Sequence, residues 1–193
     1  NLGTISGGQN GIQSSRSTLT GGITNSGSIS GVLEGISVYV SNLSDGITNS
    51  VTGTIFGGED GLAINGSTLS GGIDNSGTIS GGSVGIIAIV STLTGGITNS
   101  GSISGGIYGI FAFRSTLTDG IDNSGLISSK TGIYLKSGST LSGGITNAGL
   151  IQGTSVAGIY LNASALDGGI DNAGTISGGQ YGIYVNNGST LAG

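Results

Sequence analysis

The chain has 193 residues, including 44 glycines, and it contains no cysteine, histidine or proline. An apolar content of 35% is too high for a disordered glycine-rich linker, and the absence of proline excludes collagen. With four cationic residues, a net charge of −5 and no thiol or imidazole, we expect no nucleic acid partner, no membrane insertion by this segment, no metal and no cofactor.

The sequence repeats with a period of 24 residues, marked by one asparagine in each repeat. These asparagines are separated by 24, 24, 26, 24, 24, 24 and 25 residues, and they are Asn1, Asn25, Asn49, Asn75, Asn99, Asn123, Asn147 and Asn172. Val51 and Thr52 form a two-residue insertion, which we expect a bulge to absorb. A fixed period of this length indicates a solenoid, in which successive coils stack on one another.

Each repeat presents four apolar positions, whose first members in chain order are Ile5, Ile12, Leu19 and Ile23. Small polar residues alternate with them, and this period of two predicts strands and not helices. We therefore predict an all-β fold: a right-handed parallel β-helix (β-solenoid) of about eight coils of 24 residues, with three short strands per coil. Residues 1–193 are expected to form a single domain whose apolar columns are the core.

The corners of each coil are predicted from asparagine and glycine. We expect a structural ladder of stacked amides at Asn25, Asn49, Asn75, Asn99, Asn123, Asn147 and Asn172. The alternative is that asparagine only tolerates the left-handed geometry of a turn. Glycines recur after this asparagine, as at Gly77, and before the second apolar position, as at Gly35. A positive φ would explain both glycine columns.

The strings NSGTISGG, GI and STLTGGITNSG, in their nearest forms between Asn75 and Gly101, resemble the repeats of passenger domains of bacterial autotransporters, the surface proteins of type V secretion. The similarity covers essentially the whole chain. It implies a right-handed β-helix exported to the cell surface, often as an adhesin or stalk. Because both termini fall inside repeats, we also expect either an excerpt of a longer array or end-to-end stacking of copies.

Some β-helices are polysaccharide lyases or hydrolases, whose chemistry depends on paired carboxylates. Asp74, Asp122 and Asp171 share one repeat position and alternate there with threonine, which separates like charges by two coils. That arrangement differs from the close carboxylate pair of a glycosidase, and we expect no enzyme activity. Calcium binding at Glu59 and Asp60 is an alternative.

Large apolar residues follow the second apolar position in the last five repeats. The candidate contact stripe consists of Ile87, Ile89, Phe111, Phe113, Tyr134, Tyr160 and Tyr184, which the alternation directs outward. One interpretation is that these side chains stabilise the fold by stacking on one another. The other is that they form a contact surface for a glycan, a partner or a second solenoid that associates laterally. The predicted function is an extracellular or bacterial-surface structural and adhesive solenoid. The alternative is an ice-binding or other ligand-displaying solenoid that uses Thr and Ser ladders, including Thr-x-Thr arrays such as Thr92 and Thr94.

Overall fold

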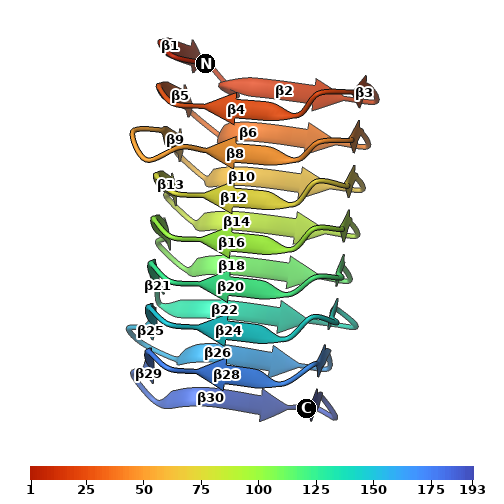
Figure 1. The fold of residues 1–193 in the computed structure, drawn as a ribbon, viewed down its shortest axis with the longest axis vertical. Coiled ribbons are helices and arrows are strands. Elements are labelled where there is room, and N and C mark those ends of the chain that lie inside the picture. Colours follow the sequence, from red (N-terminus) through yellow and green to blue (C-terminus); the bar gives the residue numbers. More distant parts are fainter.

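Each complete coil contributes one strand to each of four parallel sheets in the computed structural model, which describes residues 1–193 (Figure 1). All 31 elements are strands. Sheet A contains β1 (Thr4–Gly7), β5 (Ser28–Gly31), β9 (Thr54–Gly57), β13 (Thr78–Gly81), β17 (Ser102–Gly105), β21 (Leu126–Ser129), β25 (Leu150–Gly153) and β29 (Thr175–Gly178). Sheet B contains β2 (Ile12–Ser15), β6 (Glu34–Tyr39), β10 (Asp60–Asn65), β14 (Val84–Ile89), β18 (Tyr108–Phe113), β22 (Thr131–Lys136), β26 (Ala157–Asn162) and β30 (Tyr181–Asn186).

The other two sheets are made of shorter strands. Sheet C contains β3 (Thr18–Leu19), β7 (Asn42–Leu43), β11 (Thr68–Leu69), β15 (Thr92–Leu93), β19 (Thr116–Leu117), β23 (Thr140–Leu141), β27 (Ala165–Asp167) and β31 (Thr190–Ala192). Sheet D contains β4 (Ile23–Asn25), β8 (Ile47–Asn49), β12 (Ile73–Asn75), β16 (Ile97–Asn99), β20 (Ile121–Asn123), β24 (Ile145–Asn147) and β28 (Ile170–Asn172). The structure corrects the predicted three strands per coil to four. Glycines at positive φ, such as Gly72 at 71°, separate the third apolar position from the fourth.

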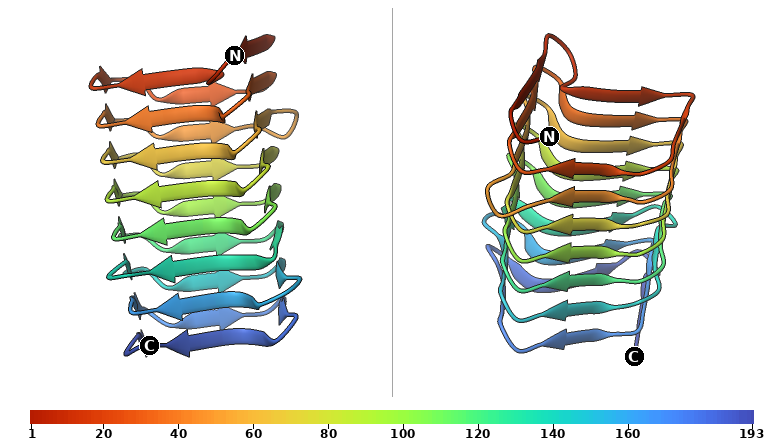
Figure 2. Two further views of the ribbon diagram at one scale, coloured as in Figure 1. Left: turned by 180° about the vertical axis from the view of Figure 1, so that it is seen from behind. Right: turned by 45° about the horizontal axis from the view of Figure 1, so that its top comes forward.

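The chain winds as a right-handed β-solenoid. In Figure 1 the sheet D strands on the near side run to the left, the sheet B strands on the far side run to the right, and the coils descend from the N-terminus. The tilted view in Figure 2 shows the same directions. Neighbouring strands pair in register one repeat apart, as in Ile79 with Ile103, so each repeat position becomes a column along the axis.

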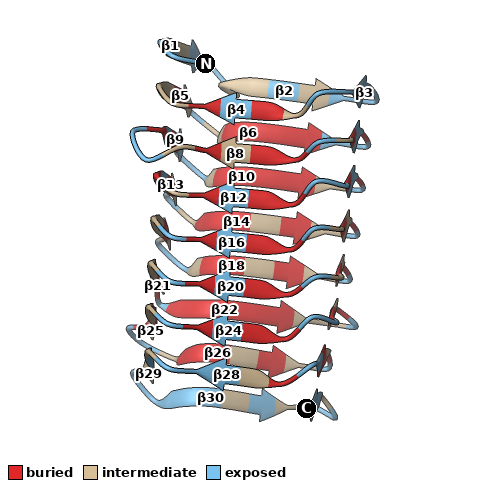
Figure 3. Cartoon of the chain, viewed as in Figure 1, coloured by how far each residue is buried: buried red, intermediate tan, exposed pale blue.

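The core is a stack of mainly Ile and Leu side chains between the sheets, and one cluster of 30 buried residues contains them together with Val38, Ala88 and Ala112. Figure 3 shows buried residues along every sheet of the middle coils. The structure adds a fifth inward column on sheet B, which the sequence analysis missed: Val38, Ile64, Ala88, Ala112, Leu135 and Leu161. Burial of each large aliphatic side chain contributes about 1.5 to 3 kcal/mol to folding.

Close packing between coils, and not a positive φ, explains the two glycine columns identified in the sequence. A Cβ on Gly35 would lie 2.6 Å from the carbonyl oxygen of Gly61, and one on Gly77 would collide with the carbonyl oxygen of Gly53. Neither glycine has a positive φ, so the predicted reason was wrong. The coils approach so closely at these corners that no side chain fits.

The insertion at Val51 and Thr52 forms a loop between β8 and β9, visible in Figure 1 as the protrusion in the third coil. The amide of Gly53 donates to the carbonyl of Ser50 at 2.7 Å and closes a turn, which leaves Val51 79% exposed. The stack continues past it, with Asn49 still paired to Asn75. A loop therefore takes the place of the expected bulge.

Candidate functional site

The contact stripe lies on one face of sheet B, over strands β14, β18, β22, β26 and β30. Two columns run along that face. Ile87, Phe111, Tyr134, Tyr160 and Tyr184 are partners in register in the first, and Ile89 is paired with Phe113 in the second. The structure thus brings all seven residues together. Six of them are partly exposed, whereas Tyr134 is only 7% exposed and so is nearly covered.

The aromatic rings of the stripe stack on one another along the solenoid axis. The ring centroids of Tyr134 and Tyr160 are 4.6 Å apart with an interplanar angle of 6°, and those of Tyr160 and Tyr184 are 4.8 Å apart. Phe111 continues the column at 5.4 Å from Tyr134. Because stacked rings cover one another's faces, this surface presents mainly ring edges.

Two further tyrosines, which were not predicted from the sequence, extend the aromatic column. The ring of Tyr108 stacks on Phe111 at 4.9 Å, and that of Tyr181 stacks on Tyr184 at 4.5 Å. Each stands three residues before its ring partner, and this recurring spacing is the signal that could have found them. The site is therefore wider than one residue per coil.

Asparagine amides hold the tyrosine hydroxyls at the edge of the column. Nδ2 of Asn162 donates to the Oη atoms of both Tyr134 and Tyr160 at 3.2 Å, and Nδ2 of Asn186 donates to Oη of Tyr184 at 2.9 Å. Desolvation raises the pKa of Tyr134 above its ordinary value, and it raises the pKa of Tyr108 in the same way. The raised pKa keeps both hydroxyls protonated near neutral pH.

The predicted Asn column is a continuous hydrogen-bonded ladder of side-chain amides. Each Nδ2 donates to Oδ1 of the asparagine in the next coil at 2.7 to 2.9 Å, from Asn25 through Asn49, Asn75, Asn99, Asn123 and Asn147 to Asn172. The six members before Asn172 are fully buried. This ladder supports the corner between sheets D and A and faces no solvent, so it is structural.

A second ladder, of serines, supports the corner between sheets B and C and was not predicted. The backbone amide of Ser67 donates to Oγ of Ser91 at 3.1 Å, and Oγ of Ser91 donates to the carbonyl of Ile89 at 2.8 Å. The serine is present in every repeat: Ser17, Ser41, Ser67, Ser91, Ser115, Ser139, Ser164 and Ser189. Its invariance along the chain was the available signal.

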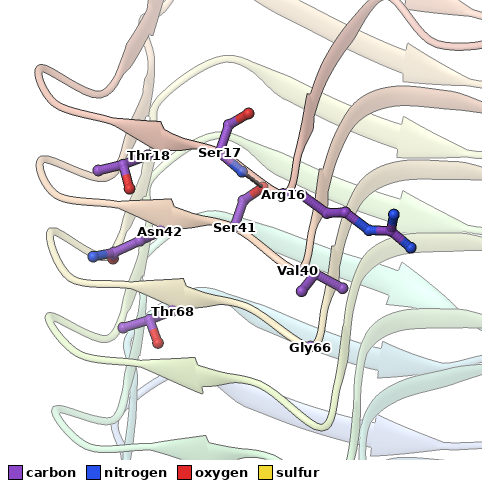
Figure 4. A pocket seen from close by; sticks show the side chains of 8 residues that line it. All are labelled: Arg16, Ser17, Thr18, Val40, Ser41, Asn42, Gly66 and Thr68. Carbon is purple, nitrogen blue, oxygen red and sulfur yellow. Dashed lines mark hydrogen bonds between the residues drawn. The ribbon is translucent and has the colours of Figure 1, made fainter.

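A shallow groove follows the same corner in the first three coils (Figure 4). Its lining is mostly polar and includes Thr18, Asn42 and Thr68, and the Arg16 side chain extends away from these three. Arg16 and Val40 have φ values of 50° and 47°, because the chain turns through the left-handed region here. The groove is a by-product of this repeated turn and contains no group with evident chemistry.

The acidic residues fall into two arrangements. Asp74 is paired with Thr48 and Thr98, and Asp122 with Thr98 and Thr146, so like charges are two coils apart as predicted. By contrast, Asp60 lies opposite Glu34 on sheet B. Desolvation, together with the charges of Glu34 and Glu59, raises the pKa of Asp60 to about 6. No group of three or more His, Cys, Asp or Glu side chains is arranged to hold a metal ion.

Sheet C carries the hydroxyls considered for ice binding. Thr68, Thr92, Thr116 and Thr140 are partners in register, but Asn42 and Ala165 occupy the same column. The hydroxyl of Thr94 donates to the carbonyl of Ser70 at 2.9 Å and so is engaged in coil-to-coil bonding. Sheet C is therefore a mixed polar face, not a uniform threonine array.

Comparisons with models of known protein families, with curated proteins and with solved structures give no match. The resemblance to autotransporter passenger repeats therefore stays a prediction. No helix of the chain has the length and apolar character needed to cross a membrane.

Proposed function

We propose that this solenoid is an extracellular structural and adhesive segment of a bacterial surface protein, without catalytic activity, that makes contact through the stripe on sheet B. The structural part of this proposal rests on the regularity of the stacked coils. Four parallel sheets run through the coils, and at about 4.8 Å per coil the eight coils span roughly 38 Å along the axis. Ladders of Ile, Leu, Asn and Ser link each coil to the next, so the column resists bending.

The adhesive part of the proposal is supported by the aromatic column on sheet B. Sheet D exposes threonine and aspartate, as at Thr98 and Asp122, whereas sheet B exposes Ile, Phe and Tyr over consecutive coils. Apolar side chains that line up over consecutive coils form a contiguous strip, which is typical of an interaction site, whereas the more exposed Val51 and Phe56 lie on a loop and on another sheet. A glycan or another surface component is the proposed partner, and a second solenoid packing laterally is the other candidate. Such use at a cell surface agrees with the resemblance to autotransporter repeats.

An adhesion assay on beads coated with the chain tests this proposal. The variant F111S/F113S removes two partly exposed rings from the stripe, and F56S removes an exposed ring from sheet A as the matched control. We expect F111S/F113S to reduce retention of the beads on cells or mucus by at least about tenfold, the change that a loss of 1.4 kcal/mol produces, and F56S to leave it within about twofold. Equal retention for both folded variants would contradict a contact role for the stripe.

Sedimentation at increasing protein concentration distinguishes a second solenoid from a different molecule as the partner of the stripe. If the two phenylalanines mediate lateral pairing, the unmodified chain forms dimers that F111S/F113S abolishes and F56S keeps. If they contact a different molecule, all three chains sediment as monomers while adhesion differs.

A further inference from the structure

Two cationic side chains lie next to the aromatic column at one edge of sheet B. The guanidinium carbon of Arg114 is 5.0 Å from the ring centroid of Phe113, and Nζ of Lys136 is 6.0 Å from that of Tyr134. The two residues occupy adjacent coils, because the backbone amide of Arg114 donates to the carbonyl of Lys136 at 3.2 Å. Contact with the rings keeps both charges on the face that carries the stripe.

This part of sheet B has no acidic residue to balance these charges. Strands β14, β18, β22, β26 and β30 contain no aspartate or glutamate, and the acids of the sheet are Glu34 and Asp60 in the second and third coils. The chain as a whole carries a net charge of −5 with only four cationic residues. Two of those four therefore flank the stripe in consecutive coils, which makes this segment complementary to an anion.

Polar groups beside the cations complete the surface. Asn162 is paired with Lys136 in register, and its amide donates to the hydroxyls of Tyr134 and Tyr160. Those hydroxyls accept from the amide and still have their own protons to donate. The segment thus combines two positive charges, hydroxyl donors and apolar ring edges within three coils.

We propose that Arg114 and Lys136, with the hydroxyl of Tyr160 that Asn162 holds in place, bind the carboxylates of an acidic polysaccharide. This inference rests on the proposed adhesive role of the stripe and names the class of glycan. An acidic sugar carries carboxylates for the two cations, hydroxyls that can bond to the Tyr160 hydroxyl, and C–H groups that pack on apolar surface. A peptide could not bind here by strand addition, because β18 and β22 are each already paired on both sides. Two cations are too few to hold the continuous phosphates of a nucleic acid.

The inference is tested by measuring how tightly the intact chain binds polygalacturonate at low ionic strength, with affinity electrophoresis as the readout. The variant R114Q/K136Q removes the two cations of the site, and R16Q/K130Q makes the same change of net charge elsewhere. We expect the first to lower the affinity at least about tenfold and the second to leave it within about twofold, since charge-assisted bonds are local. R114K/K136R keeps both charges and should retain most of the affinity. All three variants change positions outside the core, and circular dichroism is used to check that each one folds.

Other probes decide which chemistry is recognised. Neutral dextran should not bind. Binding of heparin without polygalacturonate would overturn the assignment to carboxylates, and equal binding of single-stranded DNA would overturn the assignment to sugars. An equal loss for R114Q/K136Q and R16Q/K130Q would show a non-specific charge effect and would also overturn it. If polygalacturonate fails to bind while F111S/F113S still reduces adhesion, only this inference fails and the proposed function stands.

Discussion

The side-chain amide nitrogen of Asn99 donates to Oδ1 of Asn123 at 2.7 Å. The same nitrogen donates to the carbonyl of Leu126 at 3.1 Å, and Oδ1 of Asn99 accepts from Asn75 at 2.8 Å. All three asparagines are fully buried, so none of these groups can bond to water instead. One amide thus joins three consecutive coils, and its column is the main polar support of the stack.

Replacing Asn99 with alanine should destabilise the chain by about 3 to 4 kcal/mol, because several buried polar groups lose their partners at once. Urea unfolding followed by circular dichroism measures this. The control is Thr98→Ala, an exposed position on the same strand, where the free energy of unfolding should change by no more than about 0.5 kcal/mol. Similar midpoints for the two variants would contradict the role of the ladder.

Gly77→Ala tests the close approach of neighbouring coils. A Cβ there would meet the backbone of Gly53, which cannot move aside as a flexible side chain could. We expect a loss of about 3 kcal/mol or more. Gly3 occupies the same repeat position, and no atom lies within 4 Å of the place that an alanine Cβ would take, so Gly3→Ala should cost less than about 0.5 kcal/mol. If alanine were tolerated equally at both positions, backbone collision would not explain this glycine column.

The left-handed corner before each buried serine carries local strain. Val90 has a φ of 50°, which is unfavourable for a β-branched residue, whereas the equivalent residue of the previous coil is Gly66 at 58°. Val90→Asn should therefore raise the free energy of unfolding by about 1 kcal/mol, and Gly66→Val should lower it by a similar amount. Thermal melts of the two variants check the pair. If Val90→Asn lowered the free energy of unfolding and Gly66→Val raised it, packing by the valine side chain would outweigh the backbone strain.

The period and the main apolar columns could be predicted from the sequence because a stacked solenoid repeats each environment once per coil. Ile79 pairs with Ile103, and every Ile of that column faces the same surroundings. The reason for the glycines could not be predicted, because the collision at Gly77 is with another coil and leaves no local signature. The fourth strand depends on a turn at positive φ near Gly72, which spacing alone does not specify.

The aromatic site was only partly predictable for a related reason. Side chains alternate between the two faces of a strand, so Tyr108 is predicted to point inward like Ile110, two residues later. Its ring instead stacks on that of Phe111 on the outer face. Gly109 lies between Tyr108 and Ile110, where the simple alternation fails. The near-complete burial of Tyr134 depends likewise on rings from neighbouring coils, which no single repeat reveals.

Asp60 should make the stability of the chain depend on pH in the opposite sense to a salt-bridged carboxylate. Burial and the nearby charges of Glu34 and Glu59 raise its pKa from the ordinary 3.8 to about 6 in the folded chain. Between these values the folded chain binds more protons than the unfolded chain, so the stability contributed by this group falls as pH rises from about 4 to about 6.

Asp60→Asn removes this penalty without removing the side chain. The full shift corresponds to about 3 kcal/mol, but solvent screening of a partly exposed carboxylate reduces the expected gain to about 1 kcal/mol. We therefore expect Asp60→Asn to be more stable than the unmodified chain by about 1 kcal/mol at pH 7.5, with the difference vanishing near pH 4. Urea midpoints at several pH values measure it, and Asp45→Asn, an exposed acid on another corner, is the control. A variant that is less stable than the unmodified chain at pH 7.5 would mean that the Asp60 carboxylate is stabilised by its surroundings and not destabilised by them.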